Sequence, residues 1–322
     1  MAASTTSYPE ARIANGQIEA RLYLPDARNG FYRSTRFDWS GVIASLRYEG
    51  HEYYGPWFAG VDPPVRDFVY RNGDIVVGAQ SAMVGPAEEF RTPQGYESAR
   101  PGETFVKVGV GVLSKPDDER YSGYANYPIV DPGIWLVESD ARSVTTTQEV
   151  RDPASGFGYD YRKTVRLADG RPELSIEHSL TNTGRRSIRT RQYNHNFLVL
   201  DGAPTSPDFV ITLPFEVNTT TPPDSQVAAI EGNRIVYRKT LTGEDRVFFR
   251  IQGFGPDPKD YDVRIENRAT GAGVRITSDQ PLADMSLWSI RSVISLEPDV
   301  DINLGPGESM DWTLTYTYYI AR

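Results

Sequence analysis

A strand-like alternation of apolar and polar residues runs through this chain from end to end, and it restricts the fold more than any other sequence feature. In the clearest segment, 311–318, one face carries Trp312, Leu314, Tyr316 and Tyr318, and the other carries three threonines. Residues two positions apart share a face of a β-strand, so the segment predicts a strand with one buried face. No amphipathic helix of ordinary length interrupts the pattern. The sequence therefore predicts an all-β fold of two large antiparallel sheets packed face to face, with under about a tenth of the residues in helices.

Turn signals separate the expected strands. The chain has 28 Gly and 23 Pro, and stretches such as 168–170, 182–184 and 305–308 combine Gly with Asp, Asn or Pro at hairpin-like distances. No internal repeat or low-complexity linker divides the chain. We therefore expect a loose tail over residues 1–8 and one continuous β-sandwich domain over residues 9–322.

A valine-rich segment, 105–113, predicts a strand of unusual composition. Its four valines at even positions form one face, while Lys107, Gly109 and Gly111 share the other. Glycines inside a strand mark a close backbone approach, a ligand-facing surface or a bend that curves the sheet. A close approach or ligand-facing surface, on the one hand, and a simple bend, on the other, both remain open from the sequence.

Composition excludes several classes of function. The 322 residues include 34 Lys and Arg against 43 Asp and Glu, a net charge of -9, and no basic cluster is dense enough to follow a phosphate backbone, so we expect no nucleic-acid partner. Cysteine is absent, which excludes disulfides, thiolate metal sites and cysteine nucleophiles. No apolar run is long enough to span a bilayer, and residues 1–7 lack the regions of a signal peptide. We expect no membrane partner and a cytoplasmic protein, or a periplasmic one if an export signal has been removed.

Imidazole chemistry can draw on only three histidines, His51, His178 and His195. The strand period places Tyr193, His195 and Phe197 on one face of the segment 191–202. In the segment 288–298 the same period groups Arg291, Val293, Ser295 and Glu297. If the two faces meet, a histidine, a carboxylate and arginines converge in one cleft. From the residues alone, His195 could equally be a buried imidazole bonded to a carbonyl, and Glu297 an ordinary strand-end carboxylate.

Three stretches resemble galactose mutarotase-like proteins of the aldose 1-epimerase superfamily. The stretch 159–215 contains the phrase Asn-His-Asn-Phe at 194–197, which is similar to a strand in the middle of that family. The phrase Leu-Glu-Pro at 296–298, followed by 304–309 and an aromatic strand, looks like the family's ending, and 41–52 resembles its opening hairpin. The resemblance implies a β super-sandwich with a sugar-sized cleft on one sheet.

The resemblance also implies roles for two residues. His195 matches the general acid that protonates the sugar ring oxygen, and Glu297 matches the base that takes the proton of the anomeric hydroxyl. The family usually presents a second histidine near a His-Gly-Gly phrase, which this chain lacks. His51 precedes an aromatic cluster that could border the cleft, whereas His178 alternates with apolar residues and is interpreted as structural.

Further polar residues are candidates for substrate binding. Arg36, Asp38 and Trp39 lie within four residues, a grouping that suits a sugar ring or a loop held by an ion pair. The remaining candidates are Glu89, Lys107, Tyr193 and Arg291. Arg36, Arg191, Arg291 and Lys107 would make the cleft cationic, which suits a uronate or another anionic sugar.

Three functions remain open. The first is an aldose 1-epimerase-like isomerase that acts at an anomeric centre without a cofactor. The second is a lyase or hydrolase of an oligosaccharide, in which Tyr124 or Tyr193 shares proton transfer with His195. The third is a sugar-binding protein without catalysis. A metal site of His51, His195, Glu89 and Glu297 has suitable N and O ligands, but no short ligand motif supports it.

Overall fold

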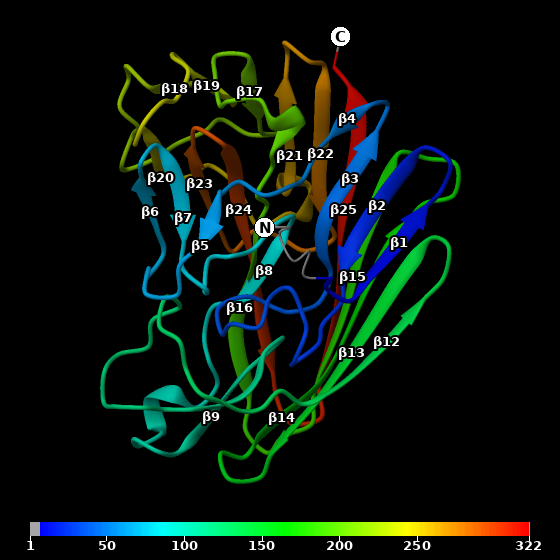
Figure 1. Ribbon diagram of the computed structural model, residues 1–322, viewed down its shortest axis with the longest axis vertical. Coiled ribbons are helices and arrows are strands. Elements are labelled where there is room, and N and C mark those ends of the chain that lie inside the picture. Colours follow the sequence, from blue (N-terminus) through cyan, green and yellow to red (C-terminus); the bar gives the residue numbers. More distant parts are fainter. Residues whose placement is uncertain (1–6, 322) are drawn as a thin grey trace, which may run out of the picture.

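The protein is described by a computed structural model that covers residues 7–321, and these residues form strands with three short 3₁₀ turns (Figure 1). The larger of two main sheets has ten strands, in the order β12 (Ile134–Ser139), β13 (Ser143–Asp152), β14 (Phe157–Leu167), β15 (Glu173–Asn182), β25 (Ser309–Ile320), β22 (Ala272–Ser278), β21 (Asp262–Asn267), β17 (Phe209–Thr212), β19 (Arg234–Tyr237) and β18 (Ala228–Glu231). The second main sheet has five, in the order β20 (Arg246–Arg250), β23 (Asp284–Ile290), β24 (Val293–Leu304), β16 (Ile188–His195) and β8 (Ala87–Phe90).

Three smaller sheets complete the fold. They are β1 (Glu10–Ala14), β2 (Ile18–Tyr23), β3 (Val42–Tyr48) and β4 (His51–Glu52); β11 (Ile129–Asp131), β10 (Gly111–Ser114) and β9 (Thr104–Lys107); and β5 (Gly60–Val61), β7 (Asp74–Val77) and β6 (Phe68–Arg71). The 3₁₀ turns are η1 (Tyr96–Ser98), η2 (Leu200–Gly202) and η3 (Pro258–Asp260). Strand pairing within the two main sheets is antiparallel. The predicted all-β fold of two large antiparallel sheets is confirmed.

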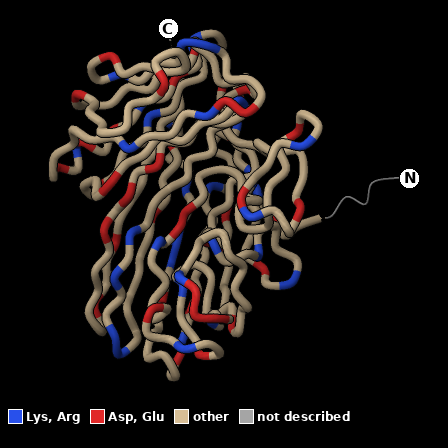
Figure 2. Tube along the Cα trace, turned by 90° about the vertical axis from the view of Figure 1, so that its left-hand side faces the viewer, with Lys and Arg blue, Asp and Glu red and all other residues tan. Residues whose placement is uncertain are grey.

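The core lies between the two main sheets, and β25 shows why its sequence forms a strand. Trp312, Leu314, Tyr316 and Tyr318 are each at most 1% exposed, while the threonines between them are half-buried. Burying these large side chains removes apolar surface from water, which is the main driving force for pairing this strand. Figure 2 shows acidic and basic residues interspersed along the strands of this side of the molecule.

The predicted turns play two different roles. The turn at 168–170 closes the antiparallel hairpin of β14 and β15. The stretches 182–184 and 305–308 instead carry the chain from one main sheet to the other. These two crossings are bonded together, because Asn182 Nδ2 donates to the carbonyl of Leu304 at 3.0 Å and the N–H of Gly307 donates to the carbonyl of Asn182 at 2.8 Å.

The single strand predicted for 105–113 is wrong. β9 and β10 form a tight hairpin there, with Lys107 paired to Gly111. Gly109 and Gly111 have φ of 78° and 136°, which L side chains rarely adopt, and a Cβ at Gly111 would lie 2.3 Å from the carbonyl oxygen of Asp131. The glycines therefore turn the chain, and the valines divide between two core clusters.

The predicted tail lies mostly outside the described residues, since residues 1–6 are not among them. Tyr8, its last residue, packs edge-on against Tyr23 and Phe31 at centroid distances of 5.5 and 5.4 Å. The packed structure therefore includes Tyr8. Within residues 7–321, no helix has the length and apolarity needed to cross a membrane.

Candidate active site

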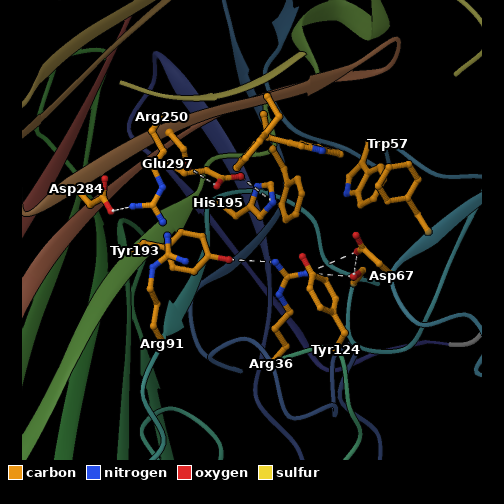
Figure 3. Close-up of a pocket in the computed structure, with 16 residues that line it drawn as sticks. Arg36, Trp57, Asp67, Arg91, Tyr124, Tyr193, His195, Arg250, Asp284 and Glu297 are labelled. Carbon is orange, nitrogen blue, oxygen red and sulfur yellow. Dashed lines mark hydrogen bonds and ion pairs between the residues drawn. The ribbon is translucent and has the colours of Figure 1, made fainter. Parts of the chain in front are cut away.

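The five-stranded sheet brings His195 and Glu297 into direct contact. His195 ends β16, Glu297 lies in the middle of the adjacent strand β24, and the imidazole Nε2 is 3.0 Å from the carboxyl Oε1. Both residues are 7% exposed and line a cavity of about 190 Å³ (Figure 3). The pair therefore combines a proton donor and a proton acceptor at one wall of a cavity.

Strand alternation explains how β16 aims His195 at the cavity. Tyr193, His195 and Phe197 line it, whereas Asn194 and Asn196 point to the opposite sheet. There both amides bond to the hydroxyl of Tyr316 on β25, at 3.1 and 2.8 Å. Buried polar groups need partners, so these bonds fix the register that turns the odd-numbered side chains toward the cavity.

Two serines hold the two halves of the pair. Ser295 Oγ lies 2.6 Å from Nδ1 of His195, on the far side of the ring from the carboxylate. The hydroxyl of Ser286, on β23, donates to Glu297 Oε2 at 3.0 Å. Cross-strand pairing sets Ser286 opposite Glu297. Each reactive group therefore has one atom held by a serine and one atom facing its partner.

Burial adjusts the protonation of the pair. Removal from water raises the pKa of Glu297 from 4.5 to about 7, although the hydroxyl of Ser286 and the charges of Arg36 and Arg91 lower it. Burial, with the same two arginines, holds the pKa of His195 well below 6.5. Near neutral pH the carboxyl of Glu297 therefore binds a proton while the imidazole of His195 stays uncharged, with Nε2 and Oε1 3.0 Å apart.

An aromatic stack backs the imidazole. The ring of Phe197 lies parallel to that of His195 at a centroid distance of 3.9 Å, and Trp57 stacks on Phe197 at 5.3 Å. Trp288 approaches the imidazole edge-on at 5.3 Å. Phe197 has a φ of 24°, which is unusual for a bulky residue and shows that the surrounding packing determines its position.

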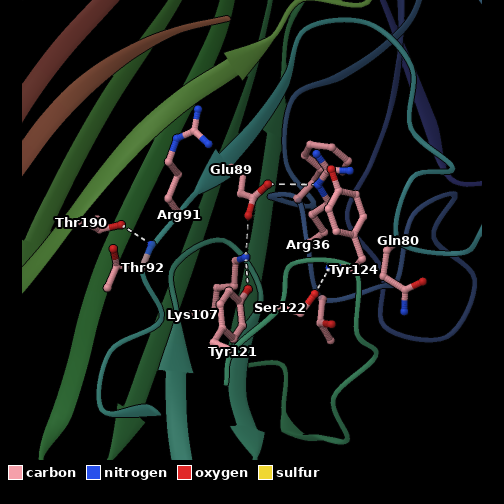
Figure 4. A network of polar contacts seen from close by, with 12 residues as sticks. Arg36, Gln80, Glu89, Arg91, Thr92, Lys107, Tyr121, Ser122, Tyr124 and Thr190 are labelled. Carbon is pink, nitrogen blue, oxygen red and sulfur yellow. Dashed lines mark hydrogen bonds and ion pairs between the residues drawn. The ribbon is translucent and has the colours of Figure 1, made fainter. Parts of the chain in front are cut away.

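A buried network forms the opposite wall of the cavity (Figure 4). Arg36 Nε donates to Glu89 Oε2 at 3.1 Å, and its Nη2 donates to the hydroxyl of Tyr193 at the same distance. That hydroxyl donates to Glu89 Oε2 at 3.0 Å, while Lys107 Nζ donates to Glu89 Oε1 at 3.3 Å from behind. The guanidinium also lies 4.5 Å from the ring centroid of Tyr124. Glu89 thus pairs with both Arg36 and Lys107, Arg36 also lies 3.7 Å from a carboxylate oxygen of Asp67, and the network fixes Tyr193.

The outer end of the cavity carries two more arginines, both exposed. Arg91 donates to both carboxylate oxygens of Asp299, at 2.6 and 2.9 Å, and lies over the ring of Tyr193 at 3.8 Å. Arg250 donates from Nη1 to Asp284 at 3.0 Å. The remaining N–H groups of both guanidinium groups are available to ligand oxygens at this end (Figure 3).

The structure brings only part of the sequence-predicted set to the cavity. Arg36, Tyr193, His195 and Glu297 line it, and Glu89 and Lys107 lie directly behind. Asp38 and Trp39 do not line it. Asp38 is 2% exposed and accepts from Lys163 at 3.1 Å between the sheets.

Trp39 stacks on Trp135 at 6.2 Å, and its indole N–H donates to the carbonyl of Ser34. Asp38 and Trp39, which lie close to Arg36 in the sequence, are therefore structural. Asp38 pairs with the buried ammonium group of Lys163, and Trp39 packs in the core.

His51 and Arg291 also lie elsewhere. His51 Nδ1 is 2.9 Å from Asp201 Oδ2, at the start of β4. Arg291 occupies the two-residue turn between β23 and β24, where the strand period no longer applies, and donates to the backbone carbonyls of Gly73 and Gly243. The prediction that these residues line the cleft is therefore wrong.

His178 is the third histidine. Its Nε2 lies 2.9 Å from Glu88, and its ring is parallel to that of Trp312 at 4.5 Å, fully inside the core. All three histidines lie within the described residues 7–321, and of them only His195 lines the cavity. Among residues 7–321, no other imidazole takes the place of the second cavity histidine that the family usually has.

Sequence reasoning did not select several lining residues. Asp67, Arg91 and Arg250 come from loops or strand ends, and Asp284 and Ser286 come from β23. Trp57, which also lines the cavity, belongs to the aromatic cluster after His51 that the sequence predicts at the border of the cleft. Strand parity could have identified Ser286 once the β23–β24 pairing was known, because Ser286 is directly opposite Glu297. No local signal identifies the others. Within residues 7–321, no group of three or more His, Asp or Glu side chains is arranged to hold a metal ion, so the alternative metal site has no geometric support.

Comparison with solved structures identifies the architecture. A galactose mutarotase-like protein from Clostridium acetobutylicum aligns with a TM-score of 0.55 over 96% of this chain and 94% of its own, at 13% identity. The chain has the galactose mutarotase-like fold. A GalM/aldose epimerase homologue from C. elegans aligns over 98% of this chain and 100% of its own, with a TM-score of 0.52 and 14% identity. For a galactose mutarotase related enzyme from Lactobacillus acidophilus the coverage is 96% and 97%, the TM-score 0.52 and the identity 13%. The sequence matches no protein-family model and no curated protein.

Proposed function

We propose that this galactose mutarotase-like chain is a sugar isomerase that exchanges the anomers of a free aldose. The observation that carries the proposal is the His195–Glu297 pair, with Nε2 and Oε1 3.0 Å apart at the wall of a cavity. Anomer exchange needs a base at the anomeric hydroxyl and an acid at the ring oxygen. Both oxygens are attached to the same carbon, so two adjacent catalytic groups can reach both of them.

The reaction assigns one step to each residue. The carboxylate of Glu297 takes the proton of the anomeric hydroxyl. The electron pair of the broken O–H bond then forms the carbonyl at C1 as the bond from C1 to the ring oxygen breaks. His195 gives its Nε2 proton to that oxygen. Rotation of the open-chain aldehyde and reversal of these transfers close the ring on the other face. Burial raises the pKa of Glu297 to about 7 and holds that of His195 well below 6.5, so near neutral pH the free protein carries the proton of the pair on Glu297. That proton must pass to Nε2 of His195, 3.0 Å away, before His195 can act as the acid and Glu297 as the base.

The charges of the cavity favour a neutral aldose as the first substrate to test. Arg36 and Lys107, which had suggested an anionic sugar, are both paired with Glu89. Arg191 pairs with Asp301 at 2.8 Å. The lining contains three arginines and three carboxyl groups, so it has no large cationic excess. A uronate is the second class to test, because Arg91 and Arg250 retain donors at the outer end.

The test is anomer exchange itself. A panel of neutral aldoses and uronates, each dissolved as a single anomer, is followed by proton NMR with and without the protein. We expect at least one sugar to equilibrate faster with the protein. Sugars that bind, as seen by perturbed resonances, but are never exchanged faster would instead support the sugar-binding alternative.

A further inference from the structure

The strand β12 (Ile134–Ser139) forms one edge of the ten-stranded sheet, and within residues 7–321 it pairs only with β13. Figure 1 shows β12 as the outermost strand on its side of the molecule. Its pairing with β13 keeps one register over its whole length, so no bulge bends the edge away. A regular edge strand of this kind offers a row of backbone groups to another strand.

The hydrogen-bond pattern shows which backbone groups of β12 face outward. The N–H of Asp140 donates to the carbonyl of Ser143 at 2.9 Å. Antiparallel strands alternate between hydrogen-bonded and non-hydrogen-bonded pairs, so the even-numbered residues of β12 bond to β13 and the odd-numbered ones do not. The N–H and C=O groups of Trp135 and Val137 therefore point away from the sheet, and among residues 7–321 they have no hydrogen-bond partner.

The side chains of this edge lack the features that usually keep an edge strand from pairing. Ile134 is 70% exposed and Leu136 is 58% exposed, and both project from the same face of the sheet. Lysine and proline commonly protect edge strands, but β12 contains neither, and Glu138 is its one charged residue. By contrast, β20, an edge of the five-stranded sheet, has an arginine at each end.

The edge is complementary to a second copy of itself. In an antiparallel pair centred on Trp135, a two-fold axis sets Trp135 opposite Trp135 of the second copy, and their outward N–H and C=O groups bond to each other. The same register sets Ile134 opposite Leu136 of the second copy. That position is a non-hydrogen-bonded pair, in which side chains lie closest, so four exposed apolar side chains cover one another. The next register of the same parity, centred on Leu136, would set Ile134 opposite Glu138.

We propose that β12 is a dimer interface, at which two copies of this chain pair their β12 strands antiparallel about Trp135 and join their ten-stranded sheets into one. A second copy fits this edge better than an unrelated strand, because the outward backbone groups and the apolar side chains both match under the same two-fold axis. The contact does not depend on the sugar chemistry. His195 and Glu297 lie on the five-stranded sheet, so dimerisation should leave anomer exchange unchanged.

Sedimentation velocity over a range of protein concentrations tests for the dimer. A contact made by one strand is small, so we expect a weak dimer with a Kd of roughly 1–100 µM. The variant Ile134→Lys/Leu136→Lys sets like charges opposite each other and should raise Kd about tenfold or more. Val61→Lys/Ile320→Lys is the matched control, because these apolar residues are 50% and 42% exposed on other strands, and it should leave Kd unchanged. Circular dichroism verifies that both variants are folded.

Disulfide cross-linking tests the register, because the chain has no cysteine of its own. In the pairing about Trp135, residue 134 of one copy and residue 136 of the other are close enough for a disulfide. Two residues 134, or two residues 136, lie on a diagonal and are too far apart. An equimolar mixture of Ile134→Cys and Leu136→Cys should therefore form a disulfide-linked dimer on mild oxidation, and each variant alone should form several-fold less.

Three results would overturn the inference. A wild-type protein that stays monomeric up to about 1 mM would show that the edge does not pair. A dimer whose Kd is unchanged in Ile134→Lys/Leu136→Lys would locate the contact elsewhere on the molecule. Cross-linking of Leu136→Cys alone that is as strong as in the mixture would exclude the pairing about Trp135. Whether any sugar undergoes anomer exchange bears on the proposed function and leaves this inference unaffected.

Discussion

Replacement of Glu297 by glutamine tests two properties of the His195–Glu297 pair separately: its proton transfer in catalysis and the effect of its buried carboxyl on the free energy of unfolding. Glutamine keeps the shape of the side chain and can still accept from Ser286 beside His195, but it cannot accept the anomeric proton. Loss of a general base typically lowers the rate about 10²-fold to 10⁴-fold, so we expect Glu297→Gln to reduce anomer exchange by this factor with the fold intact.

The same variant should be more stable than the wild type at alkaline pH. The folded protein raises the pKa of Glu297 from 4.5 to about 7 by burial, so the fold favours the protonated carboxyl. This preference costs nothing below pH 4.5, where the folded and unfolded states are both protonated. Between pH 4.5 and about 7 the unfolded state has released this proton while the folded state retains it, so stability falls as pH rises through this range and stays at the lower level above it. The full difference corresponds to at most about 3 kcal/mol at pH 8.

Urea unfolding at pH 5 and pH 8 measures this effect. Glu297→Gln should gain up to about 3 kcal/mol over the wild type at pH 8 and much less at pH 5. Glu138→Gln is the matched control, because Glu138 is an exposed carboxylate on the edge strand β12. Full turnover by Glu297→Gln, or a stability difference that is the same at both pH values, would refute the reasoning.

Three further predictions concern the same residues. His195→Asn should lose anomer exchange by about 10²-fold or more, whereas His178→Asn should keep it and lose about 3–5 kcal/mol in thermal unfolding, because Glu88 loses a buried partner at 2.9 Å. Equal activity losses in the two variants would contradict this assignment. Ser295→Ala should lower kcat about tenfold and alter its pH profile, with recovery in Ser295→Thr, since the hydroxyl 2.6 Å from Nδ1 orients the imidazole; a Thr variant as impaired as Ala would indicate a packing role. Wild-type kcat/KM should decline as pH rises above about 7, because the pair, in which burial raises the pKa of Glu297, then loses its additional proton; a rate that increases steadily from pH 6 to pH 9 would exclude this proton as the acid.

Strand periodicity predicts the all-β fold and some of the residues around His195 and Glu297. Alternation correctly groups Tyr193 and His195 on one face, because β16 is regular up to His195. Phe197 also lines the cavity, although it lies beyond the strand with a φ of 24°. It groups Ser295 with Glu297 for the same reason, and both contact His195.

The period fails where the backbone leaves the strand. Arg291 lies in a turn, and Gly109 and Gly111 take positive φ values that reverse the chain within a valine-rich run. Single-sequence patterns do not distinguish a tight hairpin of this kind from a curved strand.

Pairing between distant strands determines the remaining lining residues. Arg91 follows β8, and Arg250 ends β20, at opposite edges of the five-stranded sheet. Neither has a local signal, because the strand order that brings them to one cavity is a property of the whole sheet. Asp38 is expected in the cleft because it lies near Arg36 in the sequence. Arg36 does line the cavity, but Asp38 bonds to Lys163 between the sheets.

The most direct test of the central claim is exchange of anomers at equilibrium. Proton NMR exchange spectroscopy records the transfer of magnetisation between the two anomers of each sugar in the panel, with wild-type protein and with the His195→Asn/Glu297→Gln double variant. We expect exchange peaks for at least one sugar of the panel with the wild type and their loss with the double variant. Exchange that persists in the double variant, or that the wild type does not accelerate for any sugar it binds, would contradict the assignment of this pair as the catalytic acid and base.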